Sequence, residues 1–173
     1  LITGATGSFG SSLVEFLLQN KKFKKIIIFS RDELKQYNLK QKLDEKYNTK
    51  NLRFFIGDVR DKERVSQALN KVDVVIHAAA LKQVPSSEYN PFETIKTNVF
   101  GTQNVVEACV KNNVYKLISL STDKASSPIN LYAILSLIRQ SVASFAMEKR
   151  AGEMQELISV FKTQWPVSYT HLT

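Results

Sequence analysis

The sequence predicts an α/β protein built on a doubly wound parallel sheet. Short apolar, β-rich segments alternate with stretches of helical periodicity from residue 1 to residue 120. Strands that alternate with helices form a parallel sheet that the helices cover on both faces. Right-handed crossovers leave few topologies for such a chain, and the doubly wound sheet is the simplest of them. A glycine-rich turn between the first strand and the first helix is a second mark of this class.

The elements follow from two kinds of local pattern. Strands are expected where apolar residues stand together, and helices where apolar residues recur every three or four positions. Asn90 and Pro91 predict one helix start, with Asn90 as the cap and proline in the first turn. The predicted strands cover residues 1–3, 25–30, 52–56, 72–77 and 114–120, and the predicted helices cover about 8–20, 32–47, 61–70 and 91–112.

The pattern changes after Tyr132. Helical spacing persists over residues 133–161, but no further strand is expected there. The segment QWPVSYTHLT fits nothing before it, and its end, PVSYTHLT, resembles translated adaptor sequence. The chain starts at Leu1 inside an apolar segment, which indicates a clipped first strand. We therefore expect one α/β domain over residues 1–132, then a helical segment of doubtful reading frame, then an artefactual tail over residues 162–173.

Composition narrows the class of function. The chain has 173 residues, 43% of them hydrophobic, which suits one globular domain and excludes a disordered chain. No apolar run is long enough to cross a bilayer and no signal peptide opens the chain, so no membrane partner is expected. The single cysteine, Cys109, cannot form an internal disulfide, which favours a place in the core and a reducing cytoplasm.

The net charge of +8 permits anionic partners in general. The lysines are mostly scattered, and their one cluster, at residues 21–25, lies between a predicted helix and a predicted strand. A basic cluster indicates nucleic acid only beside a recognition element. We therefore interpret it as a solvated connection and expect no nucleic-acid partner. No metal site is predicted either.

The segment TGATGSFG at residues 3–10 places Gly4, Gly7 and Gly10 where the first strand meets the first helix. Glycines there allow a tight turn, let the backbone approach a pyrophosphate and let the helix pack closely on the sheet. The free N–H groups and dipole of the helix N-terminus favour that anion. Three glycines alone are a weak signal, but this setting favours a dinucleotide site over a structural turn.

Ser30, Arg31 and Asp32 end the second predicted strand, where folds of this class bind the adenosine ribose. An acid at the strand tip would bind the 2′-hydroxyl of NAD. Ser30 and Arg31 instead suit a 2′-phosphate, which a guanidinium contacts through two hydrogen bonds. We therefore favour NADP. The alternative is a solvated Arg31 with Asp32 as cap of the next helix, and both can hold.

The third and fourth predicted strands end in further candidates. Asp58 could accept a hydrogen bond from an adenine amino group or cap the next helix, and the sequence leaves both open. The small residues Ala78, Ala79 and Ala80 would let a cofactor lie flat over the strand ends. We expect His77, just before them, to be structural rather than catalytic.

Taken in order, the motifs TGxxGxxG, SRDELK, GDVRD, HAAALKxVP, EYNP, IKTNVxGTQNV and STDKAxxPINLY resemble those of the extended short-chain dehydrogenase/reductases. More narrowly, they resemble the inverting UDP-N-acetylglucosamine 4,6-dehydratases of pseudaminic acid and related surface-sugar pathways. The resemblance covers residues 1–132 and implies an NADP-binding Rossmann domain, truncated before the region that binds the UDP-sugar. It also implies a cytoplasmic, homo-oligomeric parent enzyme.

The resemblance implies a dehydration with a recycled cofactor. Hydride transfer from sugar C4 to NADP⁺ makes a ketone that acidifies C5–H, a base removes that proton, and water leaves from C6. The hydride then returns to C6, and C5 is reprotonated on the opposite face. Asp123 and Lys124 match the acid and base of the elimination, and Tyr132 matches the base at the C4 hydroxyl. Adjacent groups can divide such roles if their environments separate their pKa values. The candidate cofactor residues are Gly4, Thr6, Gly7, Ser8, Phe9, Gly10, Ser30, Arg31, Asp32, Lys35, Asp58, Val59, Ala78, Ala79 and Lys82.

The family pattern breaks just after the tyrosine. The family continues Tyr-Gly-Ala-Thr-Lys, but this chain has Ser136 where the lysine belongs. A tyrosine of ordinary pKa, about 10, needs that cation to act as a base near neutral pH. Three explanations stay open: a displaced cation such as Arg139, a pseudoenzyme that still binds NADP(H), or a reading-frame slip after Tyr132. We expect weak NADP(H) binding and little or no turnover of UDP-sugar.

Two other functions compete with the dehydratase. One is a non-catalytic NADP(H)-binding module, which retains the cofactor pocket without dehydration. The other is a different nucleotide-sugar enzyme of the same superfamily, such as an epimerase. The pair Asp123 and Lys124 argues against a simple reductase, which needs no elimination.

Overall fold

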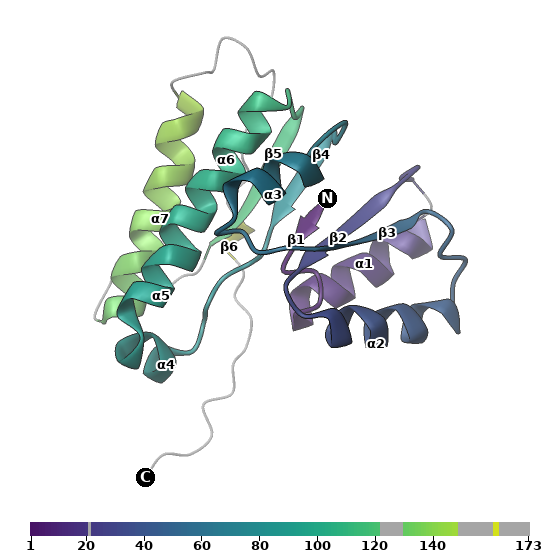
Figure 1. Cartoon of the computed structure of the whole chain (residues 1–173), viewed down its shortest axis with the longest axis horizontal. Coiled ribbons are helices and arrows are strands. Elements are labelled where there is room, and N and C mark those ends of the chain that lie inside the picture. The colour runs from purple at the N-terminus through teal and green to yellow at the C-terminus, as the bar shows by residue number, and fades with distance from the viewer. Residues whose placement is uncertain (21, 122–129, 149–160, 163–173) are drawn as a thin grey trace.

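The computed structural model describes residues 1–20, 22–121, 130–148 and 161–162. Its centre is a parallel sheet with the strand order β3-β2-β1-β4-β5-β6 (Figure 1). The order reverses between β1 and β4, which confirms the predicted doubly wound sheet and places a switch point at that junction. The strands are β1 (Ile2–Thr3), β2 (Ile26–Ser30), β3 (Leu52–Ile56), β4 (Val74–His77), β5 (Lys116–Ser121) and β6 (Phe161–Lys162).

Helices cover both faces of the sheet. In Figure 1, α1 and α2 lie on one side, and α3, α6 and α7 on the other. None of the helices in the described part of the chain is long and apolar enough to cross a membrane. Their bounds are α1 (Ser8–Asn20), α2 (Glu33–Asp44), α3 (Lys62–Ala68), α4 (Val84–Tyr89), α5 (Pro91–Ile95), the π-helical turn η1 (Lys96–Phe100), α6 (Gly101–Lys111) and α7 (Leu131–Glu148).

Strand β2 is buried along its whole length because both of its faces are covered. Successive side chains point to opposite faces, so Ile26 and Ile28 belong to one core and Ile27 and Phe29 to the other. The core under α1 and α2 includes Ile2, Val14, Leu18, Leu39 and Leu43. The core under α3 and α6 includes Val65, Leu69, Val75, Val105, Cys109 and Leu117.

Cys109 lies in this second core, as expected, and is 1% exposed. Burial raises the pKa of its thiol to about 12. A thiol that stays protonated at neutral pH is a poor nucleophile. Cys109 is therefore a packing residue.

Three local expectations are wrong. Asn90 stands at the start of α5, but its side chain makes no cap bond there and donates instead to the carbonyl of Ser86 in α4. Helix α4 itself was not predicted, because its six residues are too few to show periodicity. Strand β6 was not predicted either. Its two residues pair in parallel with Leu120 and Ser121 of β5, a long-range contact that local pattern does not encode.

Candidate functional site

A pocket of about 300 Å³ opens at the carboxyl ends of the strands, over the switch point between β1 and β4. Ligands bind at this crevice in open α/β sheets. Ser8, the first residue of α1, is exposed and does not line the pocket. The other candidate cofactor residues all line it, namely Gly4, Thr6, Gly7, Phe9, Gly10, Ser30, Arg31, Asp32, Lys35, Asp58, Val59, Ala78, Ala79 and Lys82.

The floor of the pocket depends on Gly4 and Gly10. Gly4 has φ +66, a left-handed conformation that disfavours a side chain, and a Cβ there would lie 2.8 Å from the backbone nitrogen of Ala79. A Cβ on Gly10 would lie 2.5 Å from the Cα of Ala5 and clash with the carbonyl oxygen of Gly4. The missing side chains therefore let the turn and helix α1 close tightly against β1 and β4.

One wall of the pocket is the end of β2. Asp32 is the cap of α2, and its Oδ1 accepts the backbone N–H of Lys35 at 2.9 Å. Ser30 is buried, and its Oγ accepts from Nε2 of Gln36 at 2.9 Å. Arg31 is half-exposed, and its guanidinium makes no hydrogen bond to any described residue. Asp32 thus caps α2, as one interpretation of the sequence expected, while Arg31 lines the pocket, where it could contact a phosphate.

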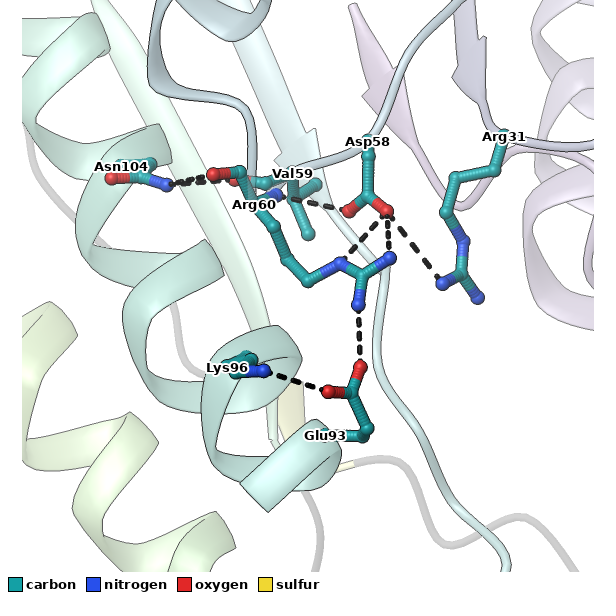
Figure 2. Close-up of polar contacts among 7 residues, drawn as sticks. All are labelled: Arg31, Asp58, Val59, Arg60, Glu93, Lys96 and Asn104. Carbon is teal, nitrogen blue, oxygen red and sulfur yellow. Dashed lines mark hydrogen bonds and ion pairs between the residues drawn. The ribbon is translucent and has the colours of Figure 1, made fainter. Parts of the chain in front are cut away.

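Asp58 forms the adjoining wall. It does not cap α3, because Asp61 does so by accepting the backbone N–H of Arg64 at 2.9 Å. The Asp58 carboxylate instead contacts Arg60 and lies 3.7 Å from Arg31 (Figure 2). Burial by itself would raise the pKa of Asp58, but the hydrogen bonds from Arg60 and the charges of both arginines outweigh it, so the pKa is lowered. The carboxyl is therefore ionised at neutral pH.

His77 is fully buried at the end of β4, which confirms the structural interpretation. Its Nδ1 lies 2.7 Å from Oγ1 of Thr3, and that oxygen accepts the backbone N–H groups of Ala78 and Ala79 at 3.1 and 3.2 Å. The hydroxyl proton of Thr3 therefore points to Nδ1. This arrangement ties β1 to the two alanines that line the pocket.

The other ring nitrogen of His77, Nε2, lies 3.0 Å from Oγ1 of Thr102. The Thr102 hydroxyl donates to the carbonyl of Asn98 at 2.7 Å and accepts from Nε of Arg139 at 3.1 Å. Its proton is thus committed, and the hydrogen-bond pattern assigns the remaining proton of His77 to Nε2. Burial first, and then the Arg139 cation, hold the pKa of His77 well below its ordinary value. His77 is therefore neutral in the fold.

Acid is expected to destabilise the fold through His77. An unfolded histidine takes up a proton below its ordinary pKa of 6.5, whereas the buried His77 of the folded chain does not. The stability that His77 contributes to the fold is therefore fully present above pH 6.5 and is lost as the pH falls below it. The free energy of unfolding should then fall as pH drops below 6.5, with a slope of up to about 1.4 kcal/mol per pH unit. Urea denaturation across this range measures the slope, and a flat profile would contradict the assignment.

Thr97 lines the pocket but was not among the candidates from the sequence. It lies in η1, is 4% exposed, and its hydroxyl oxygen has no partner among the described residues. Its neighbour Asn98 bonds both backbone groups of Leu81, at 2.8 and 3.0 Å. A buried, unpaired hydroxyl beside a pocket is suited to a bound ligand. The sequence offers little signal for it, because the helix over residues 91–112 was predicted from apolar positions and a threonine is not one of them.

Tyr132 is buried in the first turn of α7. Ser136, where the related lysine would stand, donates its hydroxyl back to the Tyr132 carbonyl at 2.8 Å. Arg139 is 9% exposed on the same helix, and burial lowers its pKa to about 10 while the Tyr132 phenol acts in the opposite direction. Arg139 is thus a charged group near Tyr132 at neutral pH. The expected elimination pair, Asp123 and Lys124, lies outside the described residues.

The family profile described as "Polysaccharide biosynthesis protein" matches residues 1–162. The chain belongs to this family. The match runs beyond Tyr132, where the motifs that carried the resemblance end. It therefore covers all of the pocket described above.

Two curated relatives are informative. A protein of Campylobacter jejuni named UDP-N-acetylglucosamine 4,6-dehydratase (inverting) is 53% identical over 160 residues, which are 92% of this chain and 46% of the relative. A Rickettsia rickettsii protein named UDP-glucose 4-epimerase is 45% identical over 157 residues, which are 88% of this chain and 45% of the relative. The chain spans less than half the length of these relatives.

Solved structures share the fold. Pen from Bacillus thuringiensis is 38% identical with a TM-score of 0.83, and the match covers 88% of this chain and 46% of that one. A double mutant of DesIV, the dTDP-glucose 4,6-dehydratase of Streptomyces venezuelae solved with NAD, is 26% identical with a TM-score of 0.77. That match covers 87% of this chain and 52% of DesIV. These structures confirm the Rossmann architecture.

Proposed function

We propose that this chain forms the cofactor-binding part of an NADP-dependent enzyme that dehydrates UDP-N-acetylglucosamine to a 4-keto-6-deoxy sugar, with inversion at C5. The observation that carries the proposal is the pocket, which gathers the candidate cofactor residues over the switch point of the sheet. Identity of 53% to the Campylobacter dehydratase supports the reaction class. The proposal includes a cytoplasmic, homo-oligomeric parent enzyme that acts in a pathway such as pseudaminic acid synthesis.

The residues of the pocket fit a dinucleotide. Gly4 and Gly10 leave a cradle that a Cβ would fill, and the N-terminus of α1 opens onto it. The buried hydroxyl of Thr97 is available for a ligand hydrogen bond. When bound, NADP would supply the reversible hydride acceptor that oxidation at C4 requires. In this proposal the glycine turn holds the pyrophosphate, and Ala78, Ala79 and Lys82 lie under the remainder of the cofactor.

NADP is proposed over NAD because of the end of β2. Asp32 is engaged as the cap of α2, so its carboxylate is less available to a ribose hydroxyl. Arg31 lines the pocket with its guanidinium donors unused among the described residues, which suits a phosphate. DesIV was solved with NAD, so the choice has to be measured for this chain.

On the substrate side, Tyr132 is proposed as the base that takes the proton of the C4 hydroxyl. A cation beside it would lower the cost of forming the phenolate. Arg139 is a charged group near Tyr132, whereas Ser136 carries no charge. Asp123 and Lys124 are proposed as acid at the C6 hydroxyl and base at C5. The frame-slip explanation of Ser136 predicts a lysine codon in a shifted frame, which DNA sequencing tests.

The test of the proposed function has two steps. Fluorescence titration of the chain with NADPH measures cofactor binding, and incubation with UDP-N-acetylglucosamine and NADP⁺, followed by NMR, identifies the product. Because the match covers 46% of the Campylobacter relative, the second step also uses the chain fused to the remaining part of that relative. A 4-keto-6-deoxy product in the fusion supports the proposal, whereas a 4-epimer supports the epimerase that the Rickettsia relative suggests.

Ser136→Lys is expected to raise turnover in that fusion. If Arg139 does not replace the missing cation, a lysine one helical turn from Tyr132 should increase the rate by roughly 10²–10⁴, the usual size of acid–base assistance. An unchanged rate would indicate that Arg139 already assists Tyr132. The measurement compares the initial dehydration rates of the fusion with and without Ser136→Lys, after NADPH titration has shown that both bind the cofactor equally well. Cofactor binding without dehydration in both forms would instead favour a non-catalytic NADP(H)-binding module.

A further inference from the structure

The carboxylate of Asp58 lies between two guanidinium groups at the end of the pocket that Ser30 and Arg31 line (Figure 2). On one side, Nε and Nη2 of Arg60 lie 2.8 and 2.6 Å from Oδ2, and the backbone N–H of Arg60 donates to Oδ1 at 3.0 Å. On the other side, Nη1 of Arg31 lies 3.7 Å from Oδ2, beyond hydrogen-bond distance. Asp58 is thus satisfied by Arg60 and only loosely paired with Arg31.

Arg60 is itself held from two directions. Its Nη1 lies 2.6 Å from Oε2 of Glu93 in α5, and the other oxygen of Glu93 pairs with Lys96 at 2.8 Å. The side-chain amide of Asn104 in α6 donates to the backbone carbonyls of Val59 and Arg60 at 3.0 and 3.2 Å. The side chain of Arg60 is therefore held by α5 and its backbone carbonyl by α6 (Figure 2).

These contacts determine whether the guanidinium donors of Arg31 are available to hydrogen-bond a ligand. A carboxylate and a guanidinium at close range form a two-fold hydrogen-bonded pair that would occupy the donors of Arg31. Arg60 takes that place on Asp58 instead. The separation of 3.7 Å between Arg31 and Asp58 is also well within the Debye length of about 8 Å, so an unneutralised Asp58 would repel any phosphate bound at Arg31.

We propose that Arg60 is a specificity-determining residue that acts through Asp58. By neutralising this carboxylate, Arg60 leaves Arg31 available to the 2′-phosphate of NADP and so sets the preference for NADP over NAD. The inference rests on the proposed NADP site. Arg60 does not line the pocket, so it acts as a positioning residue. The two cofactors that it distinguishes differ at the adenosine ribose, where NADP has a 2′-phosphate and NAD has a 2′-hydroxyl.

The prediction concerns a ratio of two affinities. In Arg60→Gln, the negative charge of Asp58 is no longer balanced by Arg60, and it draws Arg31 into a close pair. NADPH binding should weaken, while NADH, which has no 2′-phosphate, should be little affected. We expect the ratio of the NADH to the NADPH dissociation constant to fall about tenfold, the size expected when one partner of a close charge pair is removed near a surface.

The experiment titrates the chain with NADPH and with NADH and follows the fluorescence of the reduced nicotinamide. Arg64→Gln is the matched control, since it removes the same charge from a neighbouring arginine that donates to the Ile56 carbonyl rather than to Asp58. The double variant Asp58→Asn with Arg60→Gln should regain most of the preference for NADPH. Arg60→Lys, which keeps the positive charge, should also retain most of the preference for NADPH. The double variant and Arg60→Lys still test the inference if Arg60→Gln folds poorly.

The outcomes separate two kinds of failure. An unchanged chain that binds NADH as tightly as NADPH would overturn the proposed cofactor itself. If the unchanged chain prefers NADPH but Arg60→Gln weakens both cofactors equally, Arg60 has only a structural role and the inference fails. It also fails if the double variant shows the same low ratio as Arg60→Gln.

Discussion

Gly10→Ala is expected to abolish cofactor binding and to destabilise the fold by roughly 2–4 kcal/mol. Its Cβ would clash with the carbonyl oxygen of Gly4 and lie 2.5 Å from the Cα of Ala5. Both are backbone atoms at the junction of β1 and α1, so no side-chain rotation relieves the overlap. The start of α1 has to move away from the sheet, and the cradle that faces the pocket opens with it.

Gly7→Ala is the matched control for this variant. A Cβ on Gly7 meets only the carbonyl oxygen of Gly4, at 3.3 Å, and a shift of a few tenths of an ångström relieves that contact. NADPH titration and thermal denaturation of both variants measure the difference. If Gly10→Ala binds NADPH as the unchanged chain does, the close approach of α1 is not what forms the cradle.

His77→Leu is expected to lower the free energy of unfolding by about 2–4 kcal/mol at neutral pH. The leucine fills most of the volume, but the buried hydroxyls of Thr3 and Thr102 each lose a partner. Thr3 also accepts the backbone N–H groups of Ala78 and Ala79, which line the pocket. A displaced Thr3 should therefore loosen these two residues and weaken NADPH binding. Urea denaturation measures the first effect and NADPH titration the second.

The same variant tests the pH dependence. Without His77 the unfolded chain takes up one proton fewer in weak acid, so the loss of stability below pH 6.5 should be smaller than in the unchanged chain. The two unfolding profiles should therefore converge as the pH is lowered. Parallel profiles would mean that His77 is charged in the fold, against the tautomer that its two threonine partners assign.

The sequence predicted the pocket well because its parts are local signals. A glycine turn, a strand end and a helix start each depend on residues close in the chain, and the alternation of strands and helices brings strand ends to one edge. Gly4, Arg31 and Asp58 could therefore be placed at the same site before any contact was known. The fold class follows for the same reason, since each strand and each crossover helix carries its own periodicity.

Contacts between elements far apart in the sequence lie beyond such patterns. No local signal connects Arg60 with Glu93, or His77 with Thr102 and Arg139, because their partners come from distant elements. Strand β6 and the short helix α4 escaped prediction because two and six residues carry too little periodicity. The burial of Thr97 beside the pocket was not predicted, because only the apolar positions of that helix were used to find its inward face.

The sequence by itself thus determined the class of fold, the position of the pocket and the residue types that line it. The tertiary structure decided the charge state and availability of those residues. Asp58 became a carboxylate neutralised by Arg60 instead of a helix cap, and His77 a neutral link between strands and helices. The physical reason is that hydrogen bonding and burial set protonation and charge pairing, and both depend on neighbours that only the folded chain brings together.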